Sequence, residues 1–238
     1  MMGFDVIFGP SIERGPRTRR VYLTFDDGPN ERATPAILET LARERIPAAF
    51  FMVGDHVRRF PNIARQVSSA GHVVGNHTYD HLKLHFAGPK KIRTQLKKTH
   101  EMIASVTGVA PRSFRAPHGY RSPFLISIIV DMSYTVFGWT FGVFDTAKPG
   151  VDEIRRRVRK RLRPGAIVLL HDGDGYDPEG DRMQTADALG GIIRDARDAG
   201  YEFGSLTELL HNGGSPDIAG ISASSPYRPA RRAPSSPD

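Results

Sequence analysis

Short runs of strand-forming residues alternate with amphipathic segments over most of the chain, and this alternation limits the possible folds more than any other feature. The runs are rich in the β-branched and aromatic residues that favour buried strands. The segments between them repeat apolar residues every three or four positions, as amphipathic helices do. The expected strands lie at residues 21–25, 48–53, 72–76, 112–116, 134–139, 166–170 and 201–203.

Strands that alternate with helices in this way predict parallel βα units. Thr34 and Pro35 predict the N-cap and the first turn of the first helix. The chain has 238 residues, a length at which an α/β barrel commonly forms a single domain. We therefore expect a lead-in over residues 1–19, a barrel over residues 20–211 and a Pro- and Ser-rich tail over residues 212–238, which has too few apolar residues to fold.

The composition excludes several classes of site. The chain has no cysteine, so disulfides and thiolate metal sites are excluded, and any metal must be held by His, Asp or Glu. No stretch approaches the roughly 18 consecutive apolar residues of a membrane span. The first 20 residues lack the apolar core of a signal peptide. We therefore expect a cytoplasmic protein, or an extracytoplasmic one if a leader has been removed.

The formal charge of +7 is concentrated in one segment, residues 155–163, which contains six arginines and one lysine. Ile154, Val158 and Leu162 recur every four residues within it, which predicts a helix with a basic outer face. A solvated face is the favoured interpretation, and contact with the phosphates of a membrane surface is the alternative. Nucleic-acid binding has little support, since no aromatic residues are interleaved with the basic ones.

Two carboxylates close the first expected strand. The apolar residues 21–25 lead to Asp26 and Asp27, and Gly28-Pro29 then turns the chain. Side chains alternate along a strand, but where a strand enters a turn both carboxylates can reach one pocket. They would repel each other there and be costly to desolvate, so a positive group, such as a divalent metal ion, must lie beside them. The alternative is an ordinary Asp-Gly turn.

The other candidate residues also follow strand ends. In a parallel α/β barrel the ends of the strands share the C-terminal face, where active sites of barrel enzymes lie. Residues that are scattered along the sequence are therefore expected to meet at one place in space. These residues are His77, His81, Arg115, Asp145 and His171.

His77 and His81 are four residues apart, which on a helical turn would place both imidazoles on one face, within reach of one ion. Two surface histidines are the alternative. With a carboxylate from the first strand end, the pair would make a three-ligand site with open positions, as in catalytic zinc sites. Non-haem iron is also compatible with two histidines and one carboxylate, but Tyr79 stands where the iron oxygenases usually carry the carboxylate. Zinc or a similar redox-silent ion is therefore favoured.

Two further pairs are expected at the same face. Asp145 could fix the tautomer of His171 and hold its ring charged, although His171 could also serve only to end its strand. Arg115 could pair with Asp26 or Asp27 and keep that carboxylate ionised. The remaining histidines are expected to be structural or exposed; they are His56, His72, His85, His100 and His211.

Five segments together resemble the motifs of the polysaccharide deacetylase family, which is carbohydrate esterase family 4 or the NodB-homology domain. The resemblance runs from about residue 20 to residue 210, with the motifs in order. They are Thr24-Phe25-Asp26-Asp27-Gly28-Pro29, His77-Thr78-Tyr79-Asp80-His81, Arg115-Ala116-Pro117-His118-Gly119, Asp145 and Leu169-Leu170-His171.

The resemblance implies a single distorted (β/α) barrel of about seven parallel strands that uses a divalent metal to hydrolyse N- or O-acetyl groups of carbohydrates. It also implies roles by position, which fall into three groups. Asp26 is the general base and His171 the general acid, tuned by Arg115 and Asp145; Asp27, His77 and His81 hold the metal; Leu169, the backbone N–H of His118, and Tyr120 bind the substrate.

Two departures from the family pattern concern the sugar-binding rim. Thr146 follows Asp145 where the family usually has Trp, and His118 stands where an aromatic residue is common. The favoured hypothesis is a deacetylase of an N-acetylated amino sugar. The alternatives are a deformylase or deacetylase of a lipid-linked amino sugar, and a carbohydrate-binding domain of this fold that has lost catalysis. A silent protein should lack an acid, a base or a metal ligand, and here all are present.

Overall fold

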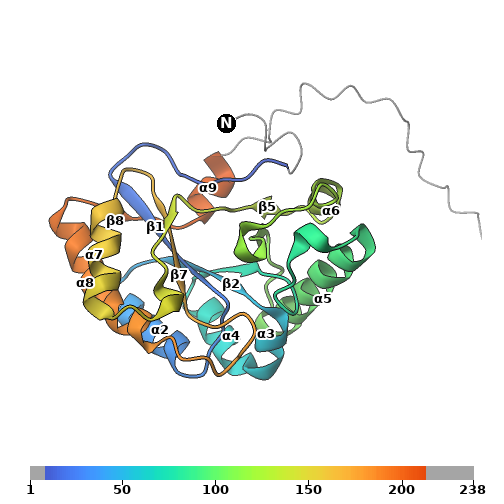
Figure 1. Ribbon diagram of the computed structural model, residues 1–238, viewed down its shortest axis with the longest axis horizontal. Helices are drawn as coiled ribbons and strands as arrows, with labels where there is room; N and C mark the ends of the chain where they lie inside the picture. The colour runs from blue at the N-terminus through green and yellow to red at the C-terminus, as the bar shows by residue number, and fades with distance from the viewer. Residues whose placement is uncertain (1–8, 213–238) are drawn as a thin grey trace, which may run out of the picture.

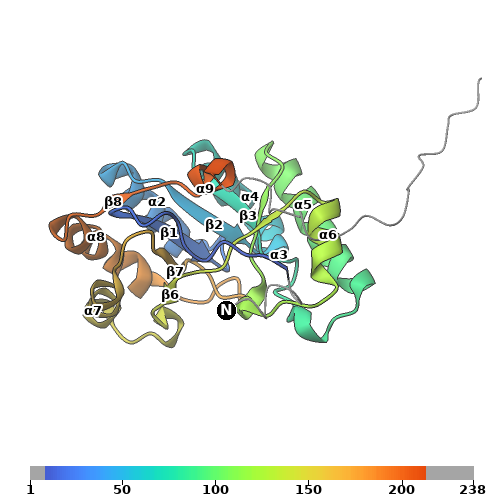
Figure 2. The ribbon, with the colours of Figure 1, turned by 90° about the horizontal axis from the view of Figure 1, so that it is seen from above.

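The computed structural model describes residues 9–212, and within them the strands form one parallel sheet. The order across the sheet is β5-β4-β3-β2-β1-β7-β6, and β8 pairs with the start of β1. The sheet curls, and helices cover its outer side, as Figures 1 and 2 show. The strands are β1 (Arg20–Asp26), β2 (Ala48–Met52), β3 (Val73–Asn76), β4 (Ser113–Phe114), β5 (Thr135–Val136), β6 (Phe141–Gly142), β7 (Ile167–His171) and β8 (Glu202–Phe203).

The helices follow the strands in the expected alternation. The α-helices are α2 (Ala33–Glu44), α3 (Gly54–Arg59), α4 (Pro61–Ser69), α5 (Pro89–Thr107), α6 (Leu125–Asp131), α7 (Val151–Arg161), α8 (Met183–Asp198) and α9 (Thr207–Asn212). Three 3₁₀ turns lie in the loops: η1 (Leu84–Phe86), η2 (Pro117–Gly119) and η3 (Asp145–Ala147). None of the described helices is long and apolar enough to cross a bilayer.

The expected distorted (β/α) barrel is confirmed. Its two edge strands, β5 and β6, are not paired with each other in the described part of the chain. The lead-in lies against both sides of this opening, because Ile12 forms a bridge with Phe137, just after β5, and the carbonyl of Glu13 accepts a hydrogen bond from Thr140, just before β6. The expected disordered tail lies, apart from Asn212, outside the described residues.

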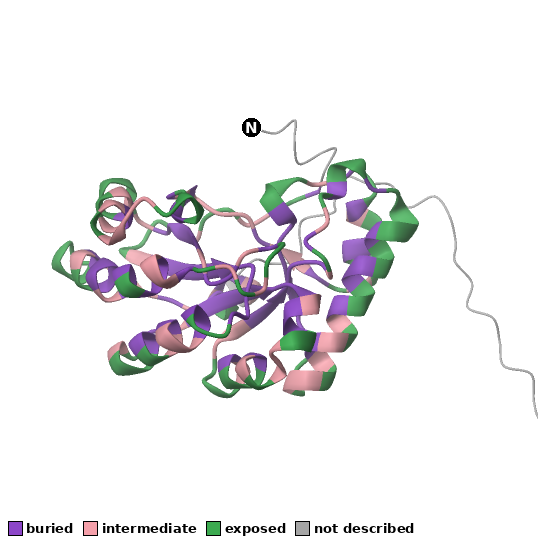
Figure 3. Ribbon diagram, turned by 60° about the horizontal axis from the view of Figure 1, so that its bottom comes forward, coloured by how far each residue is buried: buried purple, intermediate pink, exposed green. Residues whose placement is uncertain are grey.

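Side chains alternate along β1, so that one set packs outward against the helices and the other set, Tyr22, Thr24 and Asp26, faces the interior of the barrel. Val21, Leu23 and Phe25 belong to the apolar cluster that packs against the surrounding helices. The residues between them point to the opposite face of the sheet, since side chains alternate along a strand. That face leads to Asp26, the last residue of β1. Figure 3 shows the resulting pattern of buried strands enclosed by helices whose outer faces are exposed.

The basic helix α7 is amphipathic, as expected, with Ile154 and Val158 buried. Several of its arginines are engaged within the molecule. Arg157 and Arg161 donate hydrogen bonds to the carbonyls of Val143 and Gly142, which line the cavity described below. Other arginines pair with acidic residues: Arg155 with Asp195, and Arg156 and Arg157 with Glu153. Much of the basic run thus holds the loop after β6 and the neighbouring helix α8.

Three local predictions need correction. The helix α3 and the strand β6 were not expected: α3 begins at Gly54, a residue typical of turns, and the two residues of β6 lie outside the longer apolar runs. The N-cap of α2 is Arg32 rather than Thr34. The side-chain oxygen of Asn30 accepts hydrogen bonds from the backbone N–H groups of Arg32 and Ala33. The free N–H groups at the start of α2 are therefore satisfied by a residue that precedes the helix. The Thr34 hydroxyl instead donates a hydrogen bond to Asp172, at 2.7 Å.

Candidate active site

A cavity of about 570 Å³ opens at the carboxyl ends of the strands. It is the size of a pocket for a small ligand, and its position is that of active sites in barrel enzymes. Most of the residues expected in the site line it, while Arg115 and Asp145 lie behind this lining. The predicted lining residues are Asp26, Asp27, His77, His81, His118, Tyr120, Leu169 and His171.

Asp26 and Asp27 both face this cavity because the strand alternation is broken between them. Asp26 ends β1, and Asp27 has a φ of 76°, in the left-handed region. Asp tolerates this conformation better than most residues. Both carboxylates are almost fully buried. The expected pocket, rather than a simple exposed turn, is therefore what the chain forms.

Arg115 pairs with Asp26, one of the two partners that the sequence left open. Its Nη1 donates to the Asp26 carboxylate at 2.6 Å and to the Thr24 hydroxyl at 2.8 Å. Its other nitrogens donate to the carbonyls of Phe137 and Gly138. Burial lowers the pKa of this guanidinium, and the Asp26 charge opposes that effect. A fully buried charge pair with these hydrogen bonds holds the Asp26 carboxylate in one orientation.

His77 and His81 are buried and converge, but not on a helical turn as expected. They lie in an irregular loop in which Thr78 and His81 have φ values of 66° and 57°. The loop, rather than helical spacing, brings the two ring centroids within 5.1 Å. The interpretation of two surface histidines is excluded by their burial.

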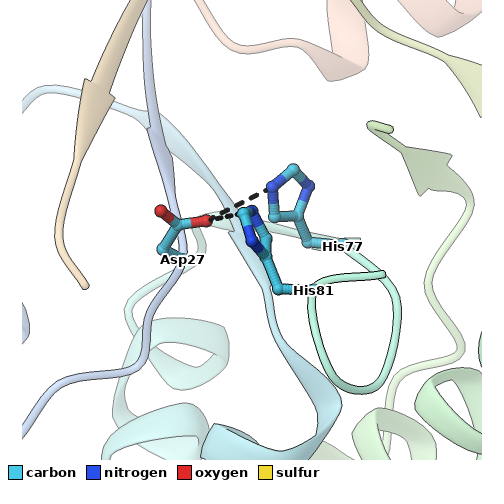
Figure 4. Close-up of side chains that lie close together, drawn as sticks. All are labelled: Asp27, His77 and His81. Atoms are coloured by element: carbon cyan, nitrogen blue, oxygen red, sulfur yellow. Dashed lines mark ion pairs between the residues drawn. The ribbon is translucent and has the colours of Figure 1, made fainter. Parts of the chain in front are cut away.

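Figure 4 shows both imidazoles directed at Asp27. The Nε2 atoms of His77 and His81 lie 3.3 and 3.0 Å from Asp27 Oδ1. One ligand atom from each residue lies within 4.8 Å of the others. Burial would raise the pKa of the Asp27 carboxyl, but the two imidazoles hold it well below its usual range. The cluster therefore contains an ionised carboxylate at the focus of two ring nitrogens.

These residues fit a metal ion. The Nδ1 of His77 lies 2.8 Å from the carbonyl oxygen of Arg115, which can only accept, so Nδ1 carries a proton. As a metal ligand the ring is neutral, and Nε2 then directs its lone pair toward the Asp27 carboxylate, so that a cation between them would be bound by both groups. Asp27 Oδ1 and His81 Nδ1 are buried without a hydrogen-bond partner among the described residues. A carbonyl that orients a metal-binding histidine in this way is a usual feature of such sites.

His171 and Asp145 form the expected pair. The ring Nδ1–H donates to Asp145 Oδ1 at 2.9 Å, and the backbone N–H of His171 donates to Oδ2 at 2.8 Å. Thr185 donates a third hydrogen bond to the same carboxylate. Burial would lower the pKa of His171, but the Asp145 charge, helped by Asp27 and Asp26, raises it to about 9. The ring is therefore protonated at neutral pH, with its Nε2 side available to the cavity.

The base and acid candidates lie on neighbouring strands in matching positions. Asp26 is the register partner of His171 in the parallel β1–β7 pair. Adjacent strands are roughly 4.8 Å apart, so the two side chains enter the cavity side by side.

Several supporting residues were missed in the sequence. His56, which was left as structural or exposed, is buried and its Nδ1 is hydrogen bonded to the Asp27 carbonyl at 2.7 Å. Gln95 accepts the backbone N–H groups of Tyr79 and Asp80, and so holds the loop between the two histidines. No local sequence signal identifies Gln95, because it lies on the next helix and acts across space.

Asp172 is a second missed residue, although its place directly after His171 could have indicated it. Its carboxylate accepts the Gly28 N–H at 3.2 Å and the Thr34 hydroxyl, and its own N–H donates to the Asp26 carbonyl. A Cβ on Gly28 would collide with this carboxylate, so only glycine allows the close approach. Asp172 thus joins the turn after β1 to the turn after β7.

The residues expected to bind substrate lie on the cavity wall, and the structure adds aromatic ones. His118, with a φ of 57°, is at the centre of η2, and no acceptor for its backbone N–H is found among the described residues. Leu169 is buried, and Tyr120 is half exposed. The rings added by the structure are Trp139, Phe144 and Tyr176.

A parallel α/β barrel whose strand ends bring a buried carboxylate, a histidine paired with a second carboxylate and a ligand-type triad to one cavity has an arrangement suited to hydrolysis. Comparison with known proteins gives the family. The polysaccharide deacetylase family model matches residues 13–137. A chitooligosaccharide deacetylase of Rhizobium leguminosarum bv. trifolii is 37% identical over 205 residues, which cover 84% of this chain and 95% of that protein.

Two solved structures are also similar. A peptidoglycan N-acetylglucosamine deacetylase, Bc1960, is 28% identical with a TM-score of 0.79, covering 87% of this chain and 95% of that one. A CE4 family pseudoenzyme from Bacillus anthracis is 32% identical with a TM-score of 0.77, covering 84% of this chain and 69% of that one. The chain therefore belongs to the polysaccharide deacetylase family, and it is a carbohydrate deacetylase-type hydrolase.

Proposed function

We propose that this protein removes the acetyl group from N-acetylglucosamine units of a glycan, with a divalent metal ion, zinc, held by Asp27, His77 and His81. The observation that carries the proposal is the shared cavity, in which Asp26 and His171 stand beside that triad. Relatives that act on chitooligosaccharide and peptidoglycan support N-acetylglucosamine as the acylated sugar. When bound, the ion would polarise the acyl carbonyl and lower the pKa of water.

The residues of this chain supply the proton transfers. Asp26, held by Arg115, accepts a proton from the water that attacks the acyl carbon. His171, kept protonated by Asp145, gives a proton to the sugar nitrogen as the carbon–nitrogen bond breaks. Acetate and the free amine leave, and the two transfers balance.

The remaining cavity residues position the acyl group. The backbone N–H of His118 donates a hydrogen bond to the oxyanion that develops on the acyl oxygen. Leu169 packs against the acetyl methyl group, and Tyr120 contacts the sugar at the rim. A pseudoenzyme of similar fold exists, so the fold alone does not imply turnover. Here the base, the acid and the triad are all present.

Acetate release tests this function directly. Purified protein is supplied with zinc and assayed on N-acetylglucosamine oligomers, peptidoglycan fragments, acetylxylan and a lipid-linked N-acetylated sugar. We expect release from the first two substrates and none from the Asp26→Asn variant under the same conditions. Release from acetylxylan alone would replace N-deacetylation with O-deacetylation. Release from the lipid-linked sugar alone would favour the membrane-linked substrate.

A further inference from the structure

The excess positive charge of this chain lies in two short segments, residues 14–19 and 159–163, which we call together the basic edge. They contain seven basic residues and no acidic one. Once these seven are set aside, the 26 basic residues that remain balance the 26 acidic ones. The formal charge of +7 is therefore the charge of the basic edge. Its basic residues are Arg14, Arg17, Arg19, Arg159, Lys160, Arg161 and Arg163.

The two segments of the basic edge lie side by side although they are far apart in the sequence. The backbone N–H of Gly15 donates a hydrogen bond to the carbonyl of Gly165 at 2.8 Å. The Arg14 guanidinium donates two hydrogen bonds to the carbonyl of Pro164, at 2.9 and 2.7 Å. Pro164 and Gly165 directly follow Arg163, so the fold joins the two segments into one basic surface.

The charges of the basic edge are exposed and are not cancelled by carboxylates within the described part of the chain. Arg161 and Arg163 donate instead to the backbone carbonyls of Gly142 and Thr140. A carbonyl holds a guanidinium in place without cancelling its charge, and other N–H groups of the guanidinium stay available to a further acceptor. Three side chains have neither a hydrogen bond nor an ion pair with any described residue: Arg17, Arg159 and Lys160.

The earlier arginines of α7 differ from those of the basic edge. Arg155 pairs with Asp195, and Arg156 pairs with Glu153. Cations in the last turn of a helix are favoured by its macrodipole, which would account for basic residues at the end of α7. The macrodipole does not account for Arg14 and Arg17, because they come from a different segment that the fold brings to the same surface.

Phe144 extends the basic edge toward the cavity. Its ring is 69% exposed, although the backbone just before it is held by Arg157 and Arg161 through the carbonyls of Val143 and Gly142. An exposed aromatic ring beside basic groups is typical of proteins that lie on a bilayer, where the cations contact phosphates and the ring enters the interface. A soluble phosphate polymer would give this ring nothing to contact, so a bilayer is the favoured partner.

We propose that the basic edge, with Phe144 at its end, binds the phosphates of an anionic lipid bilayer. The inference goes beyond the proposed function and does not rest on it. Arg161 and Phe144 also line the catalytic cavity, so the bound protein would hold the mouth of this cavity beside the membrane surface.

Sedimentation with lipid vesicles tests the proposal on the full chain. The wild type is mixed with vesicles of phosphatidylcholine, either alone or with one third phosphatidylglycerol, and the bound fraction is measured at low and at high ionic strength. We expect binding to the anionic vesicles only, and weaker binding as the salt concentration rises. Equal binding to both kinds of vesicle, or binding to neither, would overturn the proposal.

A triple variant, Arg17→Gln/Arg159→Gln/Lys160→Gln, tests the basic edge itself. These side chains make no hydrogen bond or ion pair within the described molecule, so the melting temperature should stay as in the wild type. Each basic residue close to an anionic membrane strengthens binding roughly fivefold, so the affinity for the anionic vesicles should fall roughly 100-fold. An unchanged affinity would contradict the assignment of this surface.

The matched control is a second triple variant with the same change in net charge, Lys90→Gln/Lys91→Gln/Arg112→Gln. These exposed residues lie on α5 and in the loop that follows it, and α5 is on the opposite side of the molecule from α7 (Figures 1 and 2). We expect its affinity for the anionic vesicles to change by no more than a few-fold. A fall equal to that of the first triple variant would mean that net charge alone attracts the protein, and the proposal would be wrong.

Phe144→Ala separates a bilayer from a soluble polyanion. We expect binding to the anionic vesicles to weaken several-fold, because no ring enters the interface, and the affinity for inorganic polyphosphate to stay unchanged. Phe124→Ala is the control, since Phe124 is 51% exposed and stands next to α6. If the wild type binds polyphosphate but not the vesicles, or if Phe144→Ala binds the vesicles as well as the wild type does, the bilayer is the wrong partner.

Discussion

The two halves of the active site are built in opposite ways. The triad of Asp27, His77 and His81 is enclosed, yet Asp27 Oδ1 and His81 Nδ1 have no hydrogen-bond partner among the described residues. The pair of His171 and Asp145 is satisfied by the protein itself. The Asp145 carboxylate accepts the backbone N–H and the ring of His171 as well as the hydroxyl of Thr185.

In the triad, the partners of the buried polar atoms would come from a bound ion, whereas in the pair of His171 and Asp145 the protein itself provides them. Buried polar atoms without partners are costly, and the ion that we propose would supply the partners that these two atoms lack. The pair of His171 and Asp145 has its partners in place beforehand. Loss of the ion should therefore disturb one half of the site and leave the other intact, and the following experiments test that division.

The largest effect is expected for His77→Ala. Removing one of three ligands should abolish metal binding, and activity should fall by more than the roughly 10²–10⁴-fold that a lost general base costs. Metal content of the purified protein, measured by mass spectrometry, checks the first point and acetate release the second. His100→Ala, outside the site, is the control. Equal zinc in wild type and His77→Ala would reject the ligand assignment.

Removal of the ion with a chelator should lower the melting temperature of the wild type but not that of His77→Ala. An ion present at 100 times its dissociation constant stabilises a protein by about 2.7 kcal/mol. For a domain of this size, that corresponds to a fall of roughly 5–10 °C in melting temperature. Scanning calorimetry with and without chelator measures it. An equal fall in both proteins would mean that the ion binds elsewhere.

Asp26→Asn should lose activity by about 10²–10⁴-fold while keeping its metal, because the change removes the base and leaves the ligands. The amide can still hydrogen bond to Arg115, so the fold should be little changed. Kinetics and metal analysis on the same preparation provide the measurement. If metal is lost instead, Asp26 is a ligand and the roles of the two aspartates are exchanged.

Asp145→Asn tests the other half through the pH dependence of kcat. The Asp145 charge helps to raise the pKa of His171 to about 9, so the ring should lose its proton, and the rate should fall, as pH rises through that value. Without the charge, the alkaline limb should move toward acid by about one unit or more, and the rate at neutral pH should fall about 10–100-fold. Thr185→Val keeps the charge and should move the limb far less. A limb that stays in place in Asp145→Asn would show that a group other than His171 titrates there.

Much of this site could be predicted from the sequence once the ends of the strands were assigned. Once residues 21–25 and 166–170 are assigned to parallel strands, the residues after them must meet at one edge. The pairing of His171 with Asp145 was foreseen, and that of Arg115 was foreseen only as a pairing with Asp26 or Asp27, between which the structure selects Asp26. Their geometry follows from the sheet order, which places β1 between β2 and β7.

What escaped prediction depends on backbone conformation and on contacts across space. The left-handed conformations of Asp27, Thr78 and His81 create the convergence, and none of these residues is glycine, so no sequence signal marks them. Gln95 lies on α5, 16 residues after Tyr79 in the sequence, and holds the histidine loop from there. Such long-range hydrogen bonds have no local pattern, which is why the spacing of the histidines alone suggested a helical turn.

The smallest effect is expected at Asp172, which joins the two halves. Burial raises its pKa to about 7, with Asp27 and Asp26 adding to the effect, so near neutral pH much of this carboxyl is uncharged in the folded protein. Asp172→Asn supplies a neutral group of similar shape that can still accept the Gly28 N–H. We therefore expect the metal content to be unchanged, the alkaline limb of the pH profile of kcat to stay in place, and kcat itself to change by no more than a few-fold. Asp172→Ala leaves the Gly28 N–H and the Thr34 hydroxyl without this acceptor, and should cost about 1–3 kcal/mol of stability.

The raised pKa of Asp172 gives these variants a signature in stability against pH. A carboxyl whose pKa is higher in the folded protein than in the unfolded chain loses stability as pH rises from about 4 through about 7. Asp172→Asn lacks this loss. The melting temperature of the variant minus that of the wild type should therefore be higher at pH 8 than at pH 5. Differential scanning fluorimetry at both pH values checks it. If Asp172→Asn keeps its metal and its stability but loses turnover, the carboxylate takes part in the chemistry. The division of the site into an ion-dependent half and a self-sufficient half would then have to include a third catalytic group between them.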